Sequence, residues 1–236
     1  LDGKVVTSDD EIFHPKFAEI LTYCKLDRNV MLVGGAGTGK TTLARQVADA
    51  MELDFGGVSC TMGMSESHLL GTINIKGQYT SRKFIDIYEN GGVWLFDEFD
   101  ALDSNMFCVV NSALANGYLA VPNRTDKPIA KRHKDCIVIA CGNTWGNGQG
   151  SRQYSGRNLI DGATLDRFTP VEVGYDNKLE SFLVGEHKNA FNFLNELKER
   201  CANKNLDKII SILRNVDNPK QKIMRIGGYV LLGRVI

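Results

Sequence analysis

The sequence predicts an α/β fold in which a parallel sheet alternates with helices and is followed by a smaller helical part. A glycine-rich loop lies between a short apolar run and a segment with apolar residues at helical spacing. Further apolar runs alternate with helical segments, and such alternation produces a parallel sheet with right-handed crossovers. The expected strands are residues 29–33, 53–60, 93–96, 136–141 and 169–173.

The totals of the chain exclude few functions. Its 236 residues suffice for one α/β domain with a small appendage. Lys and Arg together number 28, as do Asp and Glu, so net charge points neither to nucleic acid nor to a membrane. The 6 cysteines have no zinc-type spacing, which predicts free thiols in a reducing cytoplasm. No apolar run reaches about 18 residues, so we expect no membrane span. Because the first residue is Leu1, we expect a fragment of a longer chain.

Before the first strand, a helix is expected from residue 14, where a proline stands at an early position. Ile12 and Phe13 precede this helix. They would either contact an adenine base or pack into the core, and the core is the commoner place for apolar side chains.

Residues 34–42 form a complete P-loop pattern, Gly-Gly-Ala-Gly-Thr-Gly-Lys-Thr-Thr. The glycines would let consecutive backbone N–H groups point at phosphate oxygens, where the following helix also places its positive dipole end. Lys40 would reach the β- and γ-phosphates, and the Thr41 hydroxyl would ligate Mg²⁺. A glycine-rich turn without a ligand is the alternative, which the flanking strand and helix disfavour. The expected nucleotide-binding residues are Gly35, Ala36, Gly37, Thr38, Gly39, Lys40, Thr41 and Thr42.

The expected strand 93–96 ends directly in Asp97 and Glu98. Ligands of open α/β sheets bind at the carboxyl ends of the strands. Asp97 is therefore expected to hold Mg²⁺ together with Thr41, and Glu98 to deprotonate an attacking water. The alternative is a solvated acidic turn, which the P-loop upstream disfavours.

Two short β-hairpins are expected beside the helices. Residues 72–79 alternate apolar and polar side chains around a glycine, and residues 118–122 and 127–131 flank a turn-like quartet. Five Lys or Arg residues and one histidine lie within 124–134. This basic run is either a contact for nucleic acid or an acidic partner, or a solvated hairpin. Acidic residues that interrupt the run favour the solvated hairpin.

The strand 136–141 leads into Asn143. A polar amide at this strand tip would hold the attacking water or sense the γ-phosphate, although asparagine also favours turns. Residues 163–168 read Ala-Thr-Leu-Asp-Arg-Phe and lead into the last expected strand.

After Tyr175 the pattern changes from strands to helices. Apolar residues recur at helical spacing over 177–216, and we expect a last helix over 220–236. The predicted organisation is an α/β nucleotide-binding domain over 1–175 and a helical lid domain over 176–236.

With these residues assembled, the chain resembles the AAA+ ATPases, and within them the MoxR-like group and the AAA+ subunit of cobalt chelatase. The P-loop, Asp97-Glu98, Asn143 and Leu165-Asp166-Arg167-Phe168 stand in the order of that family. The resemblance implies a five-stranded parallel sheet of order 5-1-4-3-2 with a helical lid. Residues 71–90 are similar to the hairpin inserted in the second helix of this clade, and 118–135 to its hairpin before the sensor strand.

The resemblance also implies a homo-oligomeric ring, usually a hexamer, with Mg²⁺ and ATP bound between subunits. Arg167 then resembles the arginine finger that reaches the neighbour's γ-phosphate, and Arg157 is a weaker candidate for the interface. A structural salt bridge of Arg167 with Asp161 or Asp166 is the alternative. Arg225 is similar to the second sensor arginine, with Arg234 as the other candidate.

The function expected from the sequence is an ATP-hydrolysing motor that remodels a protein client or complex partner through its hairpins. One alternative is a nucleic-acid-stimulated motor of a phage or defence system, suggested by the basic run. Another is the ATPase subunit of a metal-chelatase-type complex. A small-molecule kinase fits poorly, because it needs neither Arg167 nor a C-terminal helical domain.

Overall fold

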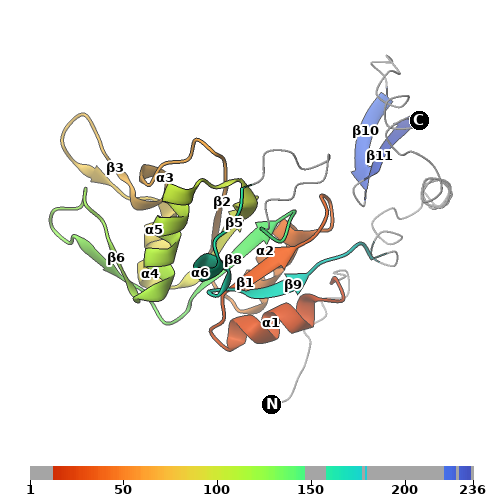
Figure 1. The fold of residues 1–236 in the computed structure, drawn as a ribbon, viewed down its shortest axis with the longest axis horizontal. Helices are drawn as coiled ribbons and strands as arrows, with labels where there is room; N and C mark the ends of the chain where they lie inside the picture. Colours follow the sequence, from red (N-terminus) through yellow and green to blue (C-terminus); the bar gives the residue numbers. More distant parts are fainter. Residues whose placement is uncertain (1–12, 147–157, 177–178, 180–220, 227–228, 235–236) are drawn as a thin grey trace. The chain divides into compact units, whose positions relative to one another are not determined.

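The structure is a computed structural model, and it describes residues 13–146, 158–176, 179, 221–226 and 229–234 (Figure 1). The chain divides into two compact units. The larger unit consists of residues 15–34 and 39–173, and the smaller of residues 1–14, 35–38 and 174–236.

A parallel sheet forms the centre of the larger unit (Figure 1). Its neighbouring strands follow the order β2-β5-β8-β1-β9, which is the order 5-1-4-3-2 when the parallel strands are numbered along the chain and read from the other edge. Ile139 lies opposite both Val30 and Leu95, so the three central strands are in register. The predicted fold is therefore confirmed. The strands are β1 (Val30–Val33), β2 (Phe55–Ser59), β5 (Gly92–Asp97), β8 (Cys136–Gly142) and β9 (Thr169–Glu172).

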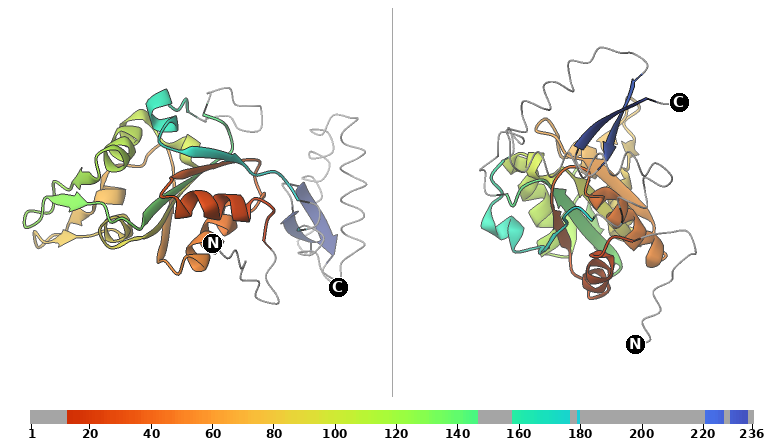
Figure 2. Two further views of the ribbon diagram at one scale, coloured as in Figure 1. Left: turned by 90° about the horizontal axis from the view of Figure 1, so that it is seen from below. Right: turned by 90° about the vertical axis from the view of Figure 1, so that its right-hand side faces the viewer.

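Helices cover both faces of this sheet (Figure 2). The guanidinium of Arg45, on α2, lies 4.7 Å from the centroid of the Phe55 ring. A Cβ on the next residue, Gly56, would come within 2.8 Å of Ile87 on α4. Successive strand residues point to opposite faces, so α2 and α4 cover opposite faces. The helices are α1 (Phe17–Lys25), α2 (Lys40–Ala50), α3 (Ser67–Leu70), α4 (Lys83–Asn90), the 3₁₀ helix η1 (Phe99–Ala101), α5 (Ser104–Ala115) and α6 (Gly162–Leu165).

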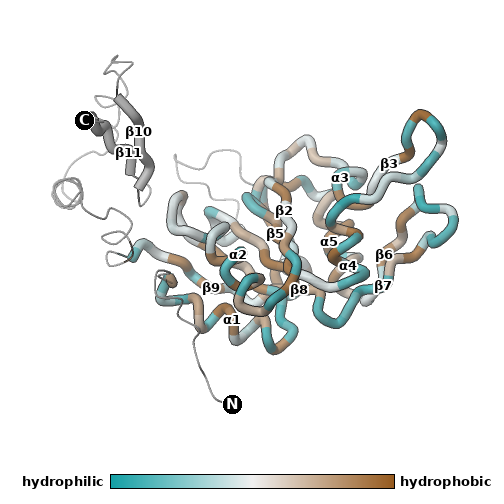
Figure 3. Tube along the Cα trace, turned by 180° about the vertical axis from the view of Figure 1, so that it is seen from behind, coloured by the Kyte–Doolittle hydropathy of each residue, from teal (hydrophilic) through white to brown (hydrophobic). Residues whose placement is uncertain are grey.

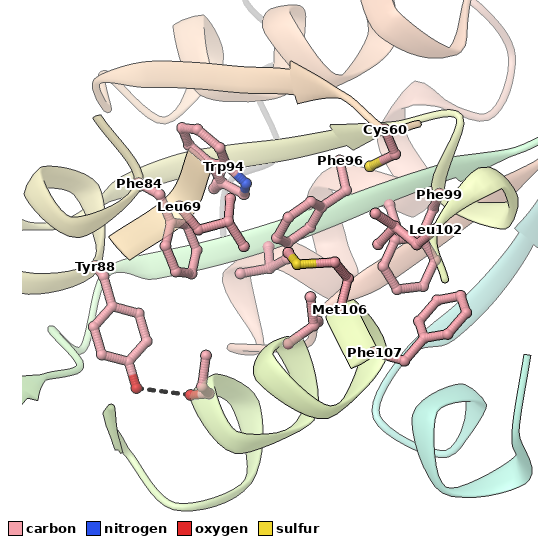
Figure 4. Packing of buried hydrophobic residues seen from close by; sticks show 14 of the residues in the cluster. Cys60, Leu69, Phe84, Tyr88, Trp94, Phe96, Phe99, Leu102, Met106 and Phe107 are labelled. Atoms are coloured by element: carbon pink, nitrogen blue, oxygen red, sulfur yellow. Dashed lines mark hydrogen bonds between the residues drawn. The ribbon is translucent and has the colours of Figure 1, made fainter. Parts of the chain in front are cut away.

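A chain of aromatic rings fills the core on the α4 and α5 side (Figure 4). Phe96 lies beside Trp94 in β5 and beside Phe99 in η1, with ring centroids 6.0 and 5.7 Å apart. Phe99 also contacts Phe107 and Phe168, at 5.2 and 5.4 Å. Each buried ring contributes roughly 1.5–3 kcal/mol. Phe99 therefore anchors the short helix that follows the β5 strand tip.

Both expected hairpins are present in the larger unit. Tyr79 donates a hydrogen bond from its hydroxyl to the carbonyl of Leu70 (2.7 Å), which ties the first hairpin to α3. Large apolar side chains are exposed on both hairpins, and the hydropathy colouring is brown at parts of them (Figure 3). These exposed residues are Ile73, Ile75, Tyr118 and Ile129. The strands are β3 (Thr72–Ile73) with β4 (Tyr79–Thr80), and β6 (Tyr118–Ala120) with β7 (Ile129–Lys131).

The helix expected over 220–236 is wrong. Strands β10 (Gln221–Ile226) and β11 (Tyr229–Arg234) pair there antiparallel, with Ile226 opposite Tyr229. The sequence Gly227-Gly228 between two apolar runs is a hairpin signal that the count of helically spaced residues overlooked. Apart from residue 179, residues 177–220 lie outside the described part, so the helical domain itself remains a prediction. No helix in the described part of the chain is long and apolar enough to cross a membrane.

Candidate active site

The P-loop pattern lies between β1 and α2, as the sequence predicts. Gly37 and Gly39 both have φ of 84°, a left-handed conformation that favours glycine. Helix α2 begins immediately afterwards at Lys40 and has no acidic residue in its first turn. Its first backbone N–H groups have no partner within the helix and, with the helix dipole, favour an anion. The local backbone therefore has the form that phosphate binding requires.

Four of the predicted site residues meet at the carboxyl edge of the sheet. The hydroxyl of Thr41, at the start of α2, donates to Asp97 Oδ2 at the end of β5 (2.9 Å). Lys40 Nζ donates to the Asn143 Oδ1 that follows β8 (3.2 Å) and to the carbonyl of Gly34 after β1 (2.7 Å). These side chains come together because β1, β5 and β8 are parallel, so their carboxyl ends lie at one edge of the sheet, where α2 also begins. We name this group of residues the carboxyl-edge site.

Burial and charge act in opposite directions on Lys40. Lys40 is only 8% exposed. This burial disfavours the charged ammonium and lowers the pKa of Lys40 below its usual range. The negative groups nearby, including Asp97 and Glu98, raise the pKa of Lys40 but do not outweigh burial. A phosphate anion at this place would favour the charged form of the ammonium.

Glu98 has an unusual backbone conformation for a residue with a side chain. Its φ is 54° and its ψ 41°, in the left-handed region. The N–H of Glu98 donates to Asp97 Oδ1 (3.0 Å), and Glu98 is exposed whereas its neighbours Phe99 and Asp100 are fully buried. Strained conformations of this kind cluster at functional sites. The conformation separates the two acids, since one faces Thr41 and the other is exposed.

The side chains of the carboxyl-edge site suit Mg²⁺, which also takes water and phosphate ligands, better than a metal ion coordinated by protein side chains alone. Among the described residues, no group of three or more His, Cys, Asp or Glu could hold a metal ion. Thr41 and Asp97 supply one hydroxyl and one carboxylate in contact with each other. Mg²⁺ is commonly bound by one or two carboxylates together with water and substrate phosphates. Thr41 and Asp97 are therefore the residues that would hold Mg²⁺ here.

Within the described part of the chain, no hydrogen bond or ion pair joins Arg167 to the carboxyl-edge site. Its guanidinium donates to the carbonyl of Ala163, in the short helix α6 that ends just before it, and its own carbonyl accepts from Asn29 (3.3 Å). Within the described residues no ion pair links Arg167 to Asp161 or Asp166. Asp161 instead caps α6 by accepting from Thr164 N (2.8 Å). Arg167 and Asp161 thus form no direct ion pair, but hydrogen bonds from Thr164 and, to a smaller extent, the charge of Arg167 lower the pKa of Asp161.

The other predicted arginines are only partly described. Arg225 lies on β10, opposite Val230, and Arg234 is the last residue of β11. Arg157 lies outside the described residues. The same is true of Ile12, one of the two residues considered for contact with an adenine base. The roles expected of Arg225 and Arg157 remain predictions.

The smaller unit contains the middle of the P-loop and a tyrosine that contacts it. The hydroxyl of Tyr175 donates to the carbonyl of Ala36 (2.9 Å). A Cβ added to Gly35 would come within 2.7 Å of this tyrosine hydroxyl oxygen. Thr38 Oγ1 donates to the carbonyl of Gly35 (3.1 Å). The imidazole of His14, which is buried, contacts the carbonyl of Gly174 (3.0 Å). Neither Tyr175 nor His14 carries a sequence signal that would have singled it out.

Local contacts use most of the charges in the basic run 124–134. Arg124 is buried and makes two hydrogen bonds to the carboxylate of Glu89, at 2.7 and 3.0 Å, and Lys127 pairs with the same carboxylate at 2.8 Å. Arg132 donates to Asn29 Oδ1 (2.7 Å) and to the carbonyl of Cys136 (2.8 Å). These contacts disfavour a nucleic-acid surface, and the burial of Arg124 also differs from the solvated hairpin that the sequence predicts.

Asp100 is a residue of the site that the sequence pattern did not reveal. It is fully buried, and its Oδ2 accepts hydrogen bonds from the backbone N–H groups of Asn143 (3.1 Å) and Thr144 (3.0 Å). An acidic residue directly after a buried aromatic was the available signal. Its partners could not be identified, because they lie 43 and 44 residues further along the chain.

Comparisons with known proteins agree with this fold. The sequence matches the AAA domain, dynein-related subfamily, over residues 29–168, which is more than half of the 236 residues. No curated protein matches the chain at a significant level.

Solved structures share the fold at low sequence identity. A "putative ATPase" from Cytophaga hutchinsonii is 18% identical with a TM-score of 0.56, over 72% of this chain and 49% of that one. NtrX from Brucella abortus is 18% identical with a TM-score of 0.52, over 67% and 36%. NtrX in complex with ADP is 16% identical with a TM-score of 0.51, over 69% and 37%. The chain thus spans about half or less of the length of these proteins, and the likeness concerns the fold alone.

Proposed function

Because the chain belongs to the AAA domain family, dynein-related subfamily, we propose that it binds and hydrolyses ATP as one subunit of a ring-forming remodelling motor. The observation that carries this proposal is the Thr41–Asp97 hydrogen bond of 2.9 Å beside the Lys40–Asn143 contact of 3.2 Å. These contacts support the proposal because they bring an ammonium, a hydroxyl, a carboxylate and an amide together at the edge of a parallel sheet where phosphates and Mg²⁺ would bind.

Each residue of the site has a distinct task in this proposal. The backbone amides from Gly35 to Thr42 and the Lys40 ammonium bind the phosphates, and Thr41 with Asp97 holds Mg²⁺. Mg²⁺ held by these two residues would neutralise charge that develops on the phosphates. Glu98, exposed beside these ligands, accepts the proton of the attacking water. Asn143 orients that water through its side-chain amide.

Arg167 acts across a subunit interface in this proposal. Its lack of a link to the carboxyl-edge site within the described residues supports a role toward a second copy of the chain. An arginine finger supplied by a neighbour increases the rate roughly 10³–10⁵-fold. A hexamer is the ring that we propose, with the second sensor role assigned to Arg225.

The exposed apolar residues of the two hairpins support contact with an unidentified protein client. The hairpins β3–β4 and β6–β7 lie within residues 71–90 and 118–135, the two segments whose sequences resemble the hairpins of the MoxR-like and chelatase group. The described cysteines are free thiols, and a reducing cytoplasm is the compartment that we propose.

A mixing experiment tests both hydrolysis and the arrangement across subunits. Turnover of ATP per subunit is measured against protein concentration, together with particle mass with and without ATP. The rate is expected to rise with concentration as ring-sized particles form. Arg167→Ala and Glu98→Gln chains should each be nearly inactive alone, and their mixture should recover turnover, because one chain supplies the finger and the other the base.

Three results would overturn parts of this proposal. A constant rate from a monomer, or no recovery on mixing two variants that bind ATP, would show that the site is complete within one chain. No turnover at any concentration by an unmutated chain that binds Mg²⁺ and ATP would exclude hydrolysis by this chain alone.

A further inference from the structure

Asp100 connects the acidic end of β5 to the turn after β8. One oxygen of its buried carboxylate, Oδ2, accepts three hydrogen bonds. Two come from the N–H groups of Asn143 (3.1 Å) and Thr144 (3.0 Å), and the third comes from the Thr144 hydroxyl (2.9 Å). A buried carboxylate is costly unless it is hydrogen bonded, so this arrangement strongly favours one conformation of the turn.

The helix that carries Asp100 is fixed on its other side. Phe99, the residue before Asp100, packs between Phe107 and Phe168 in the aromatic core. The backbone carbonyl of Asp100 accepts from the N–H of Asn158 (2.9 Å). Movement of the η1 helix would therefore require both core packing and hydrogen bonds to change.

The turn held by Asp100 is the one that presents Asn143. The side chain of Asn143 accepts a hydrogen bond from Lys40 (3.2 Å), while its backbone N–H is held by Asp100. Asp97 and Glu98 lie only two and three residues before Asp100. We infer that Asp100 is a positioning residue that holds Asn143 in register with the acidic pair, so that the sensor amide and the base keep a fixed geometry. This inference rests on the proposed ATP hydrolysis.

Two substitutions of Asp100 separate the role of its acceptor oxygen from the role of its side-chain volume. Asp100→Leu removes the acceptor at nearly unchanged size, whereas Asp100→Asn keeps one carbonyl oxygen that can accept. Thr144→Val removes the hydroxyl, which donates to Asp100 (2.9 Å) and also accepts from the N–H of Gly146 (3.4 Å), and leaves the backbone N–H of Thr144 in place. Asn158→Ala is the matched control, because its side chain donates to the carbonyl of Leu102 (2.6 Å) in the same neighbourhood and does not contact Asn143.

A double-mutant cycle with Asn143→Ala measures the coupling. Asp100→Leu should lower kcat about 10-fold or more, with KM and ATP affinity changed less than about 3-fold. Asp100→Asn should restore part of that loss, and Asn158→Ala should leave kcat within about 3-fold. In the Asn143→Ala background, Asp100→Leu should cost little more. An equal loss in both backgrounds, or a loss in Asn158→Ala as large as in Asp100→Leu, would overturn the positioning role.

Amide hydrogen exchange tests the same inference without any turnover. The N–H groups of Asn143 and Thr144 should exchange about 10-fold faster in Asp100→Leu than in Asn158→Ala. If Asp100→Leu does not fold, Asp100→Asn and Thr144→Val should show smaller increases at the same two groups. Unchanged exchange in these variants would overturn the inference even if the chain hydrolyses ATP. Faster exchange in a chain that hydrolyses no ATP would support the placement of the turn while contradicting the proposed function.

Discussion

The carboxyl-edge site and the basic run 124–134 both contain polar residues that suggested binding, and the fold uses them in opposite ways. At the sheet edge, residues from separate strand tips meet and Glu98 stays exposed. In the basic run, Arg124 and Arg132 donate to groups of the same chain that lie within the fold. A cluster of charges in the sequence therefore does not by itself indicate a binding surface, because the fold decides which groups those charges contact.

The largest expected effect belongs to Glu98, the exposed acid that follows Asp97 of the carboxyl-edge site. Glu98→Gln should reduce ATP turnover about 10²–10⁴-fold, because general-base catalysis typically contributes that much. ATP binding should persist, since the Thr41–Asp97 contact is untouched. Turnover and equilibrium binding are measured on the same preparation. Turnover at the unmutated rate would show that Glu98 is not the base.

Lys40→Met should weaken ATP binding roughly 100-fold, because hydrogen bonds between an ammonium and an anion are worth about 1.5–3 kcal/mol each. It should not lower the free energy of unfolding, since burial opposes the charged form of Lys40 and lowers its pKa. Binding titration and urea unfolding check the two statements. A variant that binds normally but unfolds more easily would reverse the assignment and make Lys40 a structural residue.

In the basic run the expected effect is on stability. Arg124→Met should reduce the free energy of unfolding by about 3 kcal/mol, because it leaves the half-buried Glu89 carboxylate with an incomplete set of partners. Lys127→Met is the matched control on the same carboxylate. The Lys127 side chain is 61% exposed against 10% for Arg124, so its loss should cost less than about 1 kcal/mol. Equal losses in the two variants, measured by urea unfolding, would contradict this account of the hairpin.

The same ion pair predicts a smaller, pH-dependent effect. The hydrogen bond from Arg124 lowers the pKa of Glu89, while burial partly opposes it. A carboxylate with a lowered pKa stabilises the fold above its unfolded pKa of about 4.3 and loses this contribution as the pH falls through the folded value. The difference in unfolding free energy between the unmutated chain and Glu89→Gln should be constant above about pH 5 and shrink at lower pH. A difference that grows on acidification would reverse the sign of this interaction.

Sequence patterns predicted the parts of the structure that depend on local chemistry. The five strands were recognisable because β1, β5 and β8 are apolar runs buried on both faces. Lys40, Thr41, Asp97 and Asn143 were identified because a glycine-rich loop and strand tips have characteristic neighbours. Their convergence followed from the parallel sheet alone.

Long-range pairing could not be predicted in the same way. The partner of Arg124 is 35 residues away and the partners of Asp100 are more than 40 away, so neither contact leaves a periodic signal. The apolar spacing of residues 220–236 predicts a helix, whereas the Gly227-Gly228 sequence between the two strands agrees with the hairpin that forms. Each of these errors concerns residues whose role is set by a distant partner or by a turn.

The dependence of ATP binding on Mg²⁺ tests the carboxyl-edge site most directly. ATP affinity is measured with and without Mg²⁺ for the unmutated chain, Thr41→Val, Asp97→Asn and the double variant. The contact between Thr41 and Asp97 predicts that Mg²⁺ strengthens ATP binding, that either substitution removes most of this gain, and that the double variant loses little more. A gain from Mg²⁺ that survives both substitutions, or no ATP binding by the unmutated chain, would contradict the assignment of this edge as the Mg²⁺ and ATP site.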